Sequence, residues 1–174
     1  MNKKLIYLMV VLLLCNFNFA EASILVDSPK AVNVNNEYLL DSLEQLLQTS
    51  YDGNQLGLQF EIKNISDNDI TITYNSGQMY DIVVYDREDN EEVYRWSNGQ
   101  YFLMVLQNIT IKSDESLVFK ENWDLKDNDG NVISDGRYEV VFFTGFNVDS
   151  EDKYCRLSEQ VDIDVKDGKI INMY

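Results

Sequence analysis

The chain has 174 residues, a net charge of −16 at pH 7 from 30 acidic and 14 basic side chains, and no histidine. The lack of histidine excludes Ser-His-Asp and Cys-His catalysis and histidine-ligated zinc or copper, and the negative charge opposes contact with nucleic acid or anionic lipid. We therefore expect a binding protein rather than an enzyme, with a protein partner, no nucleic acid, no metal and no cofactor. The oligomeric state stays open.

The first 22 residues have the pattern of an export signal. Lys3 and Lys4 precede an apolar run at 5–14, and the small residues of Ala20-Glu21-Ala22 follow it. The run is shorter than the roughly 20 apolar residues that span a bilayer. We expect residues 1–22 to be a signal peptide cleaved after Ala22, which predicts a secreted or cell-envelope protein with no transmembrane segment in its mature chain.

The sequence has two cysteines, Cys15 and Cys155. Lipidation at Cys15 is the alternative to ordinary cleavage, but a lipidated cysteine follows a small residue and Leu14 precedes this one, so we favour cleavage. Cleavage removes Cys15, and no internal disulfide can then form. We interpret Cys155 as a small, partly buried apolar residue.

Residues 23–55 are expected to form an N-terminal extension or edge segment ahead of the main domain at 56–174. A leucine stripe in this extension leaves two alternatives open. The leucines recur at helical spacing, which favours a helix, but the stripe is short for a stable helix, which favours an extended edge segment. The stripe consists of Leu39, Leu40, Leu43, Leu46 and Leu47.

The main domain alternates apolar and polar residues with period two, which is typical of half-buried strands. Strands are predicted at 56–63 and 70–74, and the turn-rich residues 64–68 between them predict a hairpin. A second hairpin is predicted from 79–86 and 91–96 across a charged tip. Further strands are expected at 101–111, 115–121, 136–146 and 156–165.

Turn residues recur about every ten positions, which favours an all-β sandwich over βαβ units. Asp167-Gly168 predicts a two-residue turn before the last strand. The motif SDGRYEV places Gly136 and Tyr138 ahead of Val140, and this order is similar to the tyrosine corner of immunoglobulin-like domains. The predicted fold class is therefore all-β, an immunoglobulin-like antiparallel β-sandwich.

Two acidic segments could either bind calcium or form turns. Counted from Asp127, the segment at 124–136 lacks the glycine that an EF-hand loop needs at its sixth position, because Val132 stands there. Asp and Asn are also favoured by turn geometry. We therefore interpret this segment and the acidic tip at 86–92 as turns.

The stretch VYRWSNGQYF at 93–102 combines four aromatic residues with the single cation Arg95. Two interpretations remain open. The aromatic residues form an exposed platform for a sugar or a polypeptide, or they lie in the core, because alternation puts Tyr94 and Trp96 on one face and Arg95 on the other. For Trp96 we favour the core.

An ordered series of motifs runs from Leu58 to about Phe146. It comprises FEIKNISDNDITITYNSGQMYDIVVYD, EEVYRWSNGQYF, Glu115-Ser116, Trp123 and SDGRYEV. In this order the motifs resemble the BsuPI-type intracellular proteinase inhibitor domain of bacteria. The positions that carry the family signature are Asn64, Ser66, Ser76, Gly77, Gln78, Asp81, Trp96, Trp123, Gly136 and Tyr138.

The chain also departs from this family pattern. Besides the export signal, Tyr94 stands where tryptophan is common, and Asp114 replaces the glycine of a Gly-Glu-Ser turn. The residues after Phe102 are Leu103-Met104-Val105, which are more apolar than the family leads us to expect.

The resemblance implies an immunoglobulin-like sandwich that binds, and inhibits, a serine proteinase of the subtilisin kind by stoichiometric occlusion. Subtilisin-like pockets accept large apolar or aromatic side chains, so we expect the partner to contact the turn after Trp96. The candidate residues are Arg95, Ser97, Asn98, Gly99, Gln100, Tyr101, Phe102 and Leu103. The acidic tip at 86–92 is a second candidate. The alternative function is a cell-envelope or adhesion module that docks another protein or a glycan.

Overall fold

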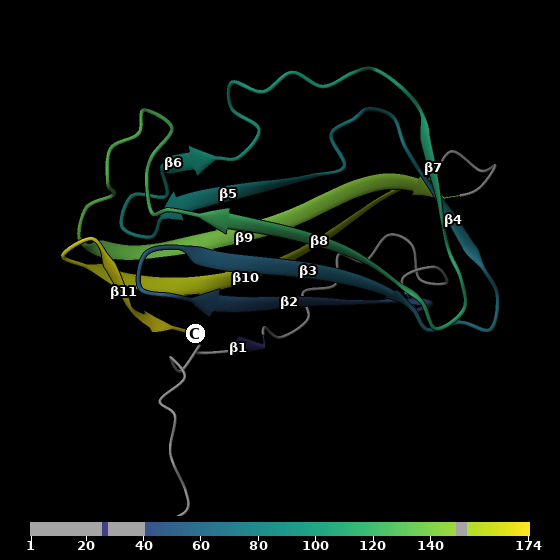
Figure 1. Cartoon of the computed structure of the whole chain (residues 1–174), viewed down its shortest axis with the longest axis horizontal. Coiled ribbons are helices and arrows are strands. Elements are labelled where there is room, and N and C mark those ends of the chain that lie inside the picture. The colour runs from purple at the N-terminus through teal and green to yellow at the C-terminus, as the bar shows by residue number, and fades with distance from the viewer. Residues whose placement is uncertain (1–25, 28–40, 149–152) are drawn as a thin grey trace, which may run out of the picture.

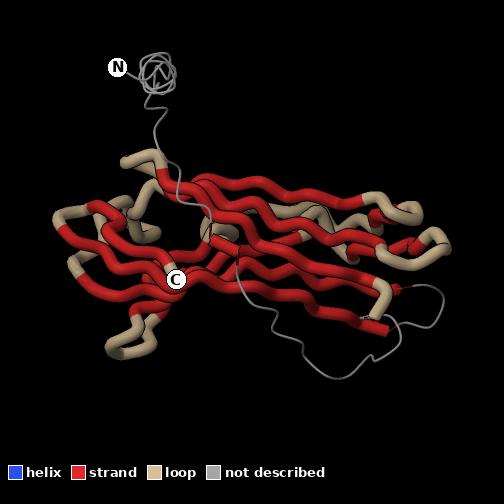
Figure 2. Tube along the Cα trace, turned by 90° about the horizontal axis from the view of Figure 1, so that it is seen from below, coloured by secondary structure: helices blue, strands red, loops and turns tan. Residues whose placement is uncertain are grey.

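The computed structural model describes residues 26–27, 41–148 and 153–174, and every regular element within them is a β-strand. The strands form two antiparallel sheets that lie face to face (Figures 1 and 2). The predicted immunoglobulin-like antiparallel sandwich is confirmed.

The first sheet contains four strands in the order β1-β2-β3-β8. Their bounds are β1 Val26–Asp27, β2 Leu43–Tyr51, β3 Leu56–Asn64 and β8 Ser116–Trp123. The second sheet runs β11-β10-β9-β4-β7, and the hairpin of β5 and β6 joins it through β9. The bounds in this sheet are β4 Ile70–Tyr74, β5 Tyr80–Asp86, β6 Glu92–Arg95, β7 Gln107–Ile111, β9 Gly136–Val148, β10 Lys153–Lys166 and β11 Lys169–Met173.

Strand β9 organises the second sheet. One edge of β9 pairs with β10 from Gly136 to Val148. The other edge pairs first with β5, through Tyr138–Thr144, and then with β4 at Asn147 and Val148. The β5–β6 hairpin and the β4–β7 pair therefore lie one after the other along the same strand, and the chain between β6 and β7 must pass from one to the other (Figure 1).

The core lies between the two sheets. Buried and partly exposed residues alternate strictly along β3 and β4, as the period-two pattern predicts. The ring of Phe60 from β3 stacks on the ring of Phe142 from β9, with centroids 5.0 Å apart. The bulkiest fully buried side chains are Trp123, Tyr74, Tyr138, Phe60, Phe142 and Phe146.

The leucine stripe contributes a strand and not a helix. Strand β2, Leu43–Tyr51, pairs with β3 along its whole length, whereas Leu39 and Leu40 lie outside the described residues. Leu43 and Leu47 point into the core while Leu46 is half-buried on the other face. The helix alternative is wrong because pairing with β3 selects the extended form, in which the buried positions recur every second residue.

Two further predictions about strands are wrong. The strands at 56–63 and 70–74 are not a hairpin, because β3 and β4 lie in different sheets and residues 65–69 cross between them. Alternation shows which side chains face the core but not which strand is the partner. Of the predicted strand at 101–111, only residues 107–111 form a strand, β7. Residues 101–106 lie outside the sheet, and the Leu103 carbonyl accepts a hydrogen bond from the N–H of Gly77.

Three local predictions are confirmed. Strands β5 and β6 pair as a hairpin. Asp167 and Gly168 both have positive φ angles, 52° and 69°, as a two-residue type I′ turn requires. The Tyr138 hydroxyl donates to the carbonyl oxygen of Ser134 at 2.9 Å, which is the hydrogen bond of a tyrosine corner.

The predicted signal peptide, its cleavage site and Cys15 lie outside the described residues. Cys155 is buried in β10, in line with its interpretation as an apolar residue. Within the part of the chain that the structure describes, no helix has the length and apolar character needed to cross a membrane.

Candidate functional site

Asp81 is the buried centre of the turn that follows β6. Its side chain, on β5, is 4% exposed. Oδ1 accepts hydrogen bonds from the backbone N–H groups of Ile82 and Ser97, and Oδ2 accepts from Ser97 Oγ at 2.7 Å and from Arg95 Nη1 at 3.1 Å. A buried carboxylate is tolerated when donors satisfy both of its oxygens. Asp81 therefore fixes the Arg95 to Ser97 segment onto β5.

Arg95 is held inside the protein's own network. Its guanidinium donates to both carboxylate oxygens of Glu92 in addition to Asp81, and its backbone N–H and C=O both bond to the side-chain amide of Asn128 at 2.8 Å. The bonds to Glu92 and then to Asp81 raise the pKa of Arg95 above its ordinary value, although burial opposes them. Arg95 thus supports the turn from beneath.

The aromatic residues of this region divide between the core and the surface. Trp96 is half-buried and packs on Tyr80, with ring centroids 4.5 Å apart, and on Phe102, at 5.8 Å. Tyr94 packs on Trp123 at 5.6 Å. The core interpretation of Trp96 is confirmed. Tyr101 differs from the others because its side chain is fully exposed.

Ser97 to Gln100 form a compact turn above this aromatic layer. The backbone N–H of Gln100 donates to the Ser97 carbonyl at 3.0 Å, and the Gln100 side-chain amide donates to the Trp96 carbonyl at 2.7 Å. Gly99 has a φ angle of 74°, which favours glycine. Asn98, Gly99 and Gln100 are exposed. The turn is therefore a fixed platform that leads directly into the next segment.

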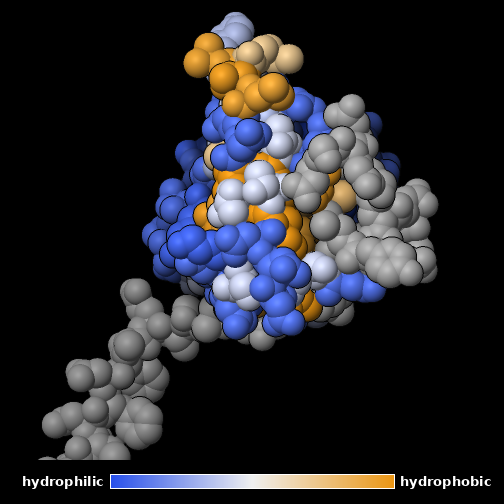
Figure 3. Space-filling model, turned by 90° about the vertical axis from the view of Figure 1, so that its right-hand side faces the viewer, coloured by the Kyte–Doolittle hydropathy of each residue, from blue (hydrophilic) through white to orange (hydrophobic). Residues whose placement is uncertain are grey.

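Residues 101–106, here called the apolar projection, expose a run of large hydrophobic side chains. The exposed fractions are 101% for Tyr101, 79% for Leu103, 87% for Met104, 48% for Val105 and 69% for Leu106. Figure 3 shows hydrophobic residues gathered on a protrusion at the top of the molecule, where Figure 1 places the chain between β6 and β7. Contiguous apolar surface of this kind marks an interaction site more often than chance.

Two hydrogen bonds, one within the apolar projection and one directly after it, anchor this segment to the turn that precedes β5. The Gly77 N–H donates to the Leu103 carbonyl at 2.8 Å, and the Gln107 side-chain amide donates to the Ser76 carbonyl at 3.1 Å. Ser76 Oγ in turn accepts from the Gln78 N–H. The Ser-Gly-Gln part of the family signature therefore holds the projection in place.

Other signature residues stabilise the sandwich away from this surface. Asn64 is fully buried at the end of β3, and its amide donates to the Asn68 and Ile111 carbonyls while its oxygen accepts from Ser66. It links the two sheets at the crossing. Trp123 donates its indole N–H to the Lys126 carbonyl at 2.8 Å, and Gly136 begins β9 beside the Tyr138 ring.

The acidic segments adopt turns. Asp127 Oδ1 accepts from the N–H groups of Asp129 and Asn131, and the hydrogen bonds from Asn131 are the main reason that the pKa of Asp127 is lowered. At the 86–92 tip, Asp86 and Asp89 accept from backbone N–H groups two residues ahead. The interpretation as turns is confirmed.

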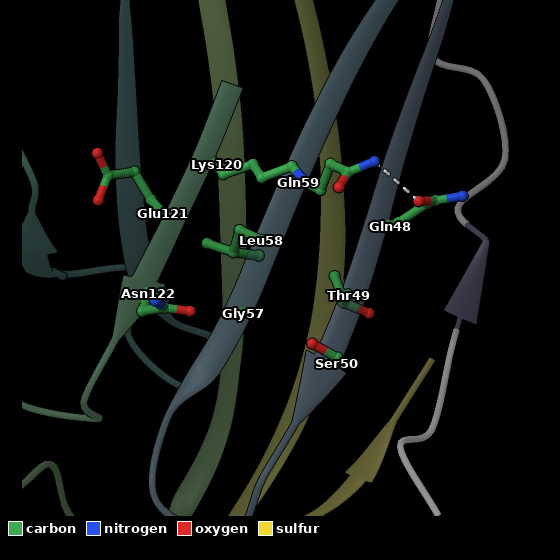
Figure 4. A pocket seen from close by; sticks show the side chains of 9 residues that line it. All are labelled: Gln48, Thr49, Ser50, Gly57, Leu58, Gln59, Lys120, Glu121 and Asn122. Carbon is green, nitrogen blue, oxygen red and sulfur yellow. Dashed lines mark hydrogen bonds between the residues drawn. The ribbon is translucent and has the colours of Figure 1, made fainter. Parts of the chain in front are cut away.

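A surface hollow of about 320 Å³ lies across β2, β3 and β8 (Figure 4). Gly57 leaves space between Ser50 and Asn122, and the amide of Gln59 donates to Gln48 at 3.1 Å on the same surface. The lining is mainly polar, and none of its side chains is aromatic. We therefore regard the apolar projection as the better candidate site.

Comparison with known proteins decides the family. The family model described as "BsuPI: Intracellular proteinase inhibitor" matches residues 43–147, which is more than half of the chain. The chain belongs to the BsuPI family. The match begins at β2 and ends in β9, so it includes Asp81, the turn at 95–100 and the apolar projection. Membership of a family of proteinase inhibitors points to a protein partner and to a role other than catalysis.

Comparisons with curated proteins and with solved structures do not identify a function. A search of curated proteins found no match. Among solved structures, the chain is similar to Spo0M, a sporulation control protein from Bacillus subtilis, with 16% identity and a TM-score of 0.35. The match covers 72% of this chain and 49% of that one, so this chain spans about half of its length.

The BsuPI family description corrects the prediction of export. The family is described as an intracellular proteinase inhibitor, and this conflicts with a secreted or cell-envelope protein. The prediction of export rested on residues 1–22 alone, where a short apolar run after two lysines was interpreted as a signal. On the family description it is wrong.

The structure brings together part of the predicted site and adds to it. Arg95 and Ser97 meet at Asp81, and Ser97 to Leu103 form one continuous surface segment. Sequence reasoning ended the candidate loop at Leu103 and omitted Met104, Val105 and Leu106. The signal that could have found them is the apolar run Leu103-Met104-Val105, which departs from the family pattern.

Proposed function

We propose that this protein inhibits a subtilisin-like serine proteinase by stoichiometric occlusion of the proteinase's cleft, with the segment from Ser97 to Leu103 as the contact. The observation that supports this proposal is the exposed apolar segment that continues from a turn fixed by Asp81. Arg95 and Ser97 hold the segment, and Tyr101 and Leu103 supply exposed apolar side chains.

The physical basis is preorganisation. A loop that is already ordered loses little conformational entropy on binding, so more of the contact energy appears as affinity. An extended segment can add main-chain hydrogen bonds in the cleft while one side chain fills the specificity pocket. The large apolar side chains of the projection match the preference of subtilisin-like pockets.

The test is a titration of the full chain against subtilisin, with residual activity measured on a small chromogenic substrate. We expect activity to fall in proportion to added protein and to reach its minimum near one-to-one stoichiometry, while the chain stays intact or receives a single cut. Full activity at a tenfold molar excess of the chain, or rapid degradation into many fragments, would contradict the proposal.

A second candidate function is docking of another protein without inhibition. It rests on the same exposed side chains of the apolar projection, because an apolar protrusion fits any complementary apolar pocket. Binding to subtilisin without loss of activity on the small substrate would favour it.

A further inference from the structure

The peptide bond that enters a serine proteinase must have a free carbonyl oxygen. That oxygen occupies the proteinase's oxyanion hole, so it cannot be engaged elsewhere. The Leu103 carbonyl accepts from the N–H groups of both Gly77, at 2.8 Å, and Val105, at 3.0 Å. Leu103 is therefore unsuited to be the residue before the cleaved bond, although its side chain is exposed.

The side chain before the bond must also leave the scaffold to fill a pocket. Phe102 is half-buried against Trp96. Tyr101 is exposed, but the residue on the other side of the bond that follows it is Phe102, whose ring packs on Trp96. Met104 is 87% exposed and has exposed neighbours on both sides. Within the described residues, Met104 makes no hydrogen bond of its own.

The backbone around Met104 is nonetheless fixed. The Val105 N–H to Leu103 carbonyl bond closes a three-residue turn centred on Met104. The φ angle of Met104 is not positive, so this is the inverse γ-turn, a low-energy conformation. The turn presents the Met104 side chain and carbonyl at its apex.

Both sides of the Met104–Val105 bond are tied to the same turn. On the N-terminal side Leu103 bonds to Gly77, and on the C-terminal side Gln107 bonds to Ser76 and begins β7, which pairs with β4. A cut after Met104 would leave the two new ends next to each other. The effective concentration of the new amine near the new acyl group would then be high, which favours resynthesis of the bond.

We propose that Met104 fills the specificity pocket of the proteinase and that Met104–Val105 is the reactive bond. This assignment rests on the proposed function and extends its contact segment past Leu103 to Val105. The proteinase's serine oxygen bonds to the Met104 carbonyl carbon, the bond to the Val105 nitrogen breaks, and the serine's proton passes to that nitrogen. The retained Val105 amine can attack the ester and restore the peptide and the serine hydroxyl. Water can instead release the Met104 carboxylate and regenerate the serine.

The test combines cleavage mapping with matched variants of the full chain. The chain is incubated with a small amount of subtilisin, and intact masses locate the first cut. Inhibition constants are then measured for Met104→Asp and for Ile171→Asp, which changes an exposed apolar residue of β11 that the proposal does not use. Circular dichroism and urea unfolding confirm that each variant is folded.

We expect a single cut between Met104 and Val105. We also expect Met104→Asp to weaken inhibition by at least about 30-fold, as loss of a central contact does, while Ile171→Asp stays within about threefold of the wild type. A first cut elsewhere, or an unchanged inhibition constant for folded Met104→Asp, would overturn the assignment and leave the proposed function standing. If the wild-type chain inhibits no subtilisin-like proteinase, both are wrong.

Discussion

The turn held by Asp81, residues 95–100, and the apolar projection, residues 101–106, are adjacent in sequence but differ in what their side chains contact. From Arg95 to Gln100 the polar groups bond to other parts of the protein, with Asp81 as the central acceptor. From Tyr101 to Leu106 the side chains are mostly apolar and exposed, and two anchors at Ser76 and Gly77 hold the backbone. Charged and polar residues in a binding loop can thus be its support, while the apolar residues form its contact surface.

Among the substitutions considered, the largest loss of stability should come from removing Asp81, which supports the turn. Asp81→Ala leaves Arg95 and the Ser97 N–H without their buried acceptor, so we expect the free energy of unfolding to fall by about 3 kcal/mol in urea denaturation. Asp86→Ala is the matched control, because Asp86 lies on the same strand, β5, but its side chain accepts a hydrogen bond only within the exposed tip. A control that loses as much stability as Asp81→Ala would show that Asp81 has no special role.

Asn64 tests whether another buried polar centre behaves like Asp81. Asn64→Ala removes an amide that bonds to Asn68, Ile111 and Ser66, so we expect a loss of about 2 kcal/mol in the same measurement. Asn108→Ala, at an exposed position of β7, should cost less than about 0.5 kcal/mol. Equal losses for the two variants would contradict this expectation.

Asp164, a half-buried surface carboxylate, should contribute less to stability than Asp81 or Asn64, and its contribution should disappear in acid. Hydrogen bonds from Tyr174, Asn172 and Arg137 lower the pKa of Asp164 to about 2 from 3.8. A lowered folded-state pKa stabilises the protein above the unfolded value, and this stabilisation is lost as the pH falls from about 4 to about 2. The stability difference between wild type and Asp164→Asn, measured by urea unfolding, should therefore shrink over that range. A difference that is constant from pH 6 to pH 2 would contradict the assignment.

The smallest effect on stability should come from the contact surface itself. Met104→Ser changes a side chain that is 87% exposed, so we expect the free energy of unfolding to stay within about 0.5 kcal/mol of the wild type. Thermal and urea unfolding both measure it. A loss above about 1.5 kcal/mol would mean that Met104 packs in solution and that the projection is part of the fold.

The predictable part of this molecule was the orientation of side chains. Alternation in β3 and β4 identified inward residues such as Phe60 and Ile72, because facing the core leaves a local trace in the sequence. Pairing leaves no such trace, and β3 and β4 proved to belong to different sheets.

The candidate site was predicted only in part for a related reason. The run from Leu103 to Leu106 is as apolar as a buried strand, and its exposure depends on anchors at Ser76 and Gly77, about thirty positions earlier in the chain. Likewise, Arg95 and Ser97 looked available for a partner because their acceptor, Asp81, lies on a different strand.

The pairing of strands that lie far apart in the sequence has a consequence for how the chain reaches its native state. In the pairing of β3 with β8, Leu56 meets Trp123, and in the pairing of β5 with β9, Tyr80 meets Thr144. Contacts so distant along the chain require large loops to close before they stabilise anything, and domains of this type refold in milliseconds to seconds. During that interval the unpaired strand edges and the apolar projection are exposed together, so refolding yield should fall as protein concentration rises.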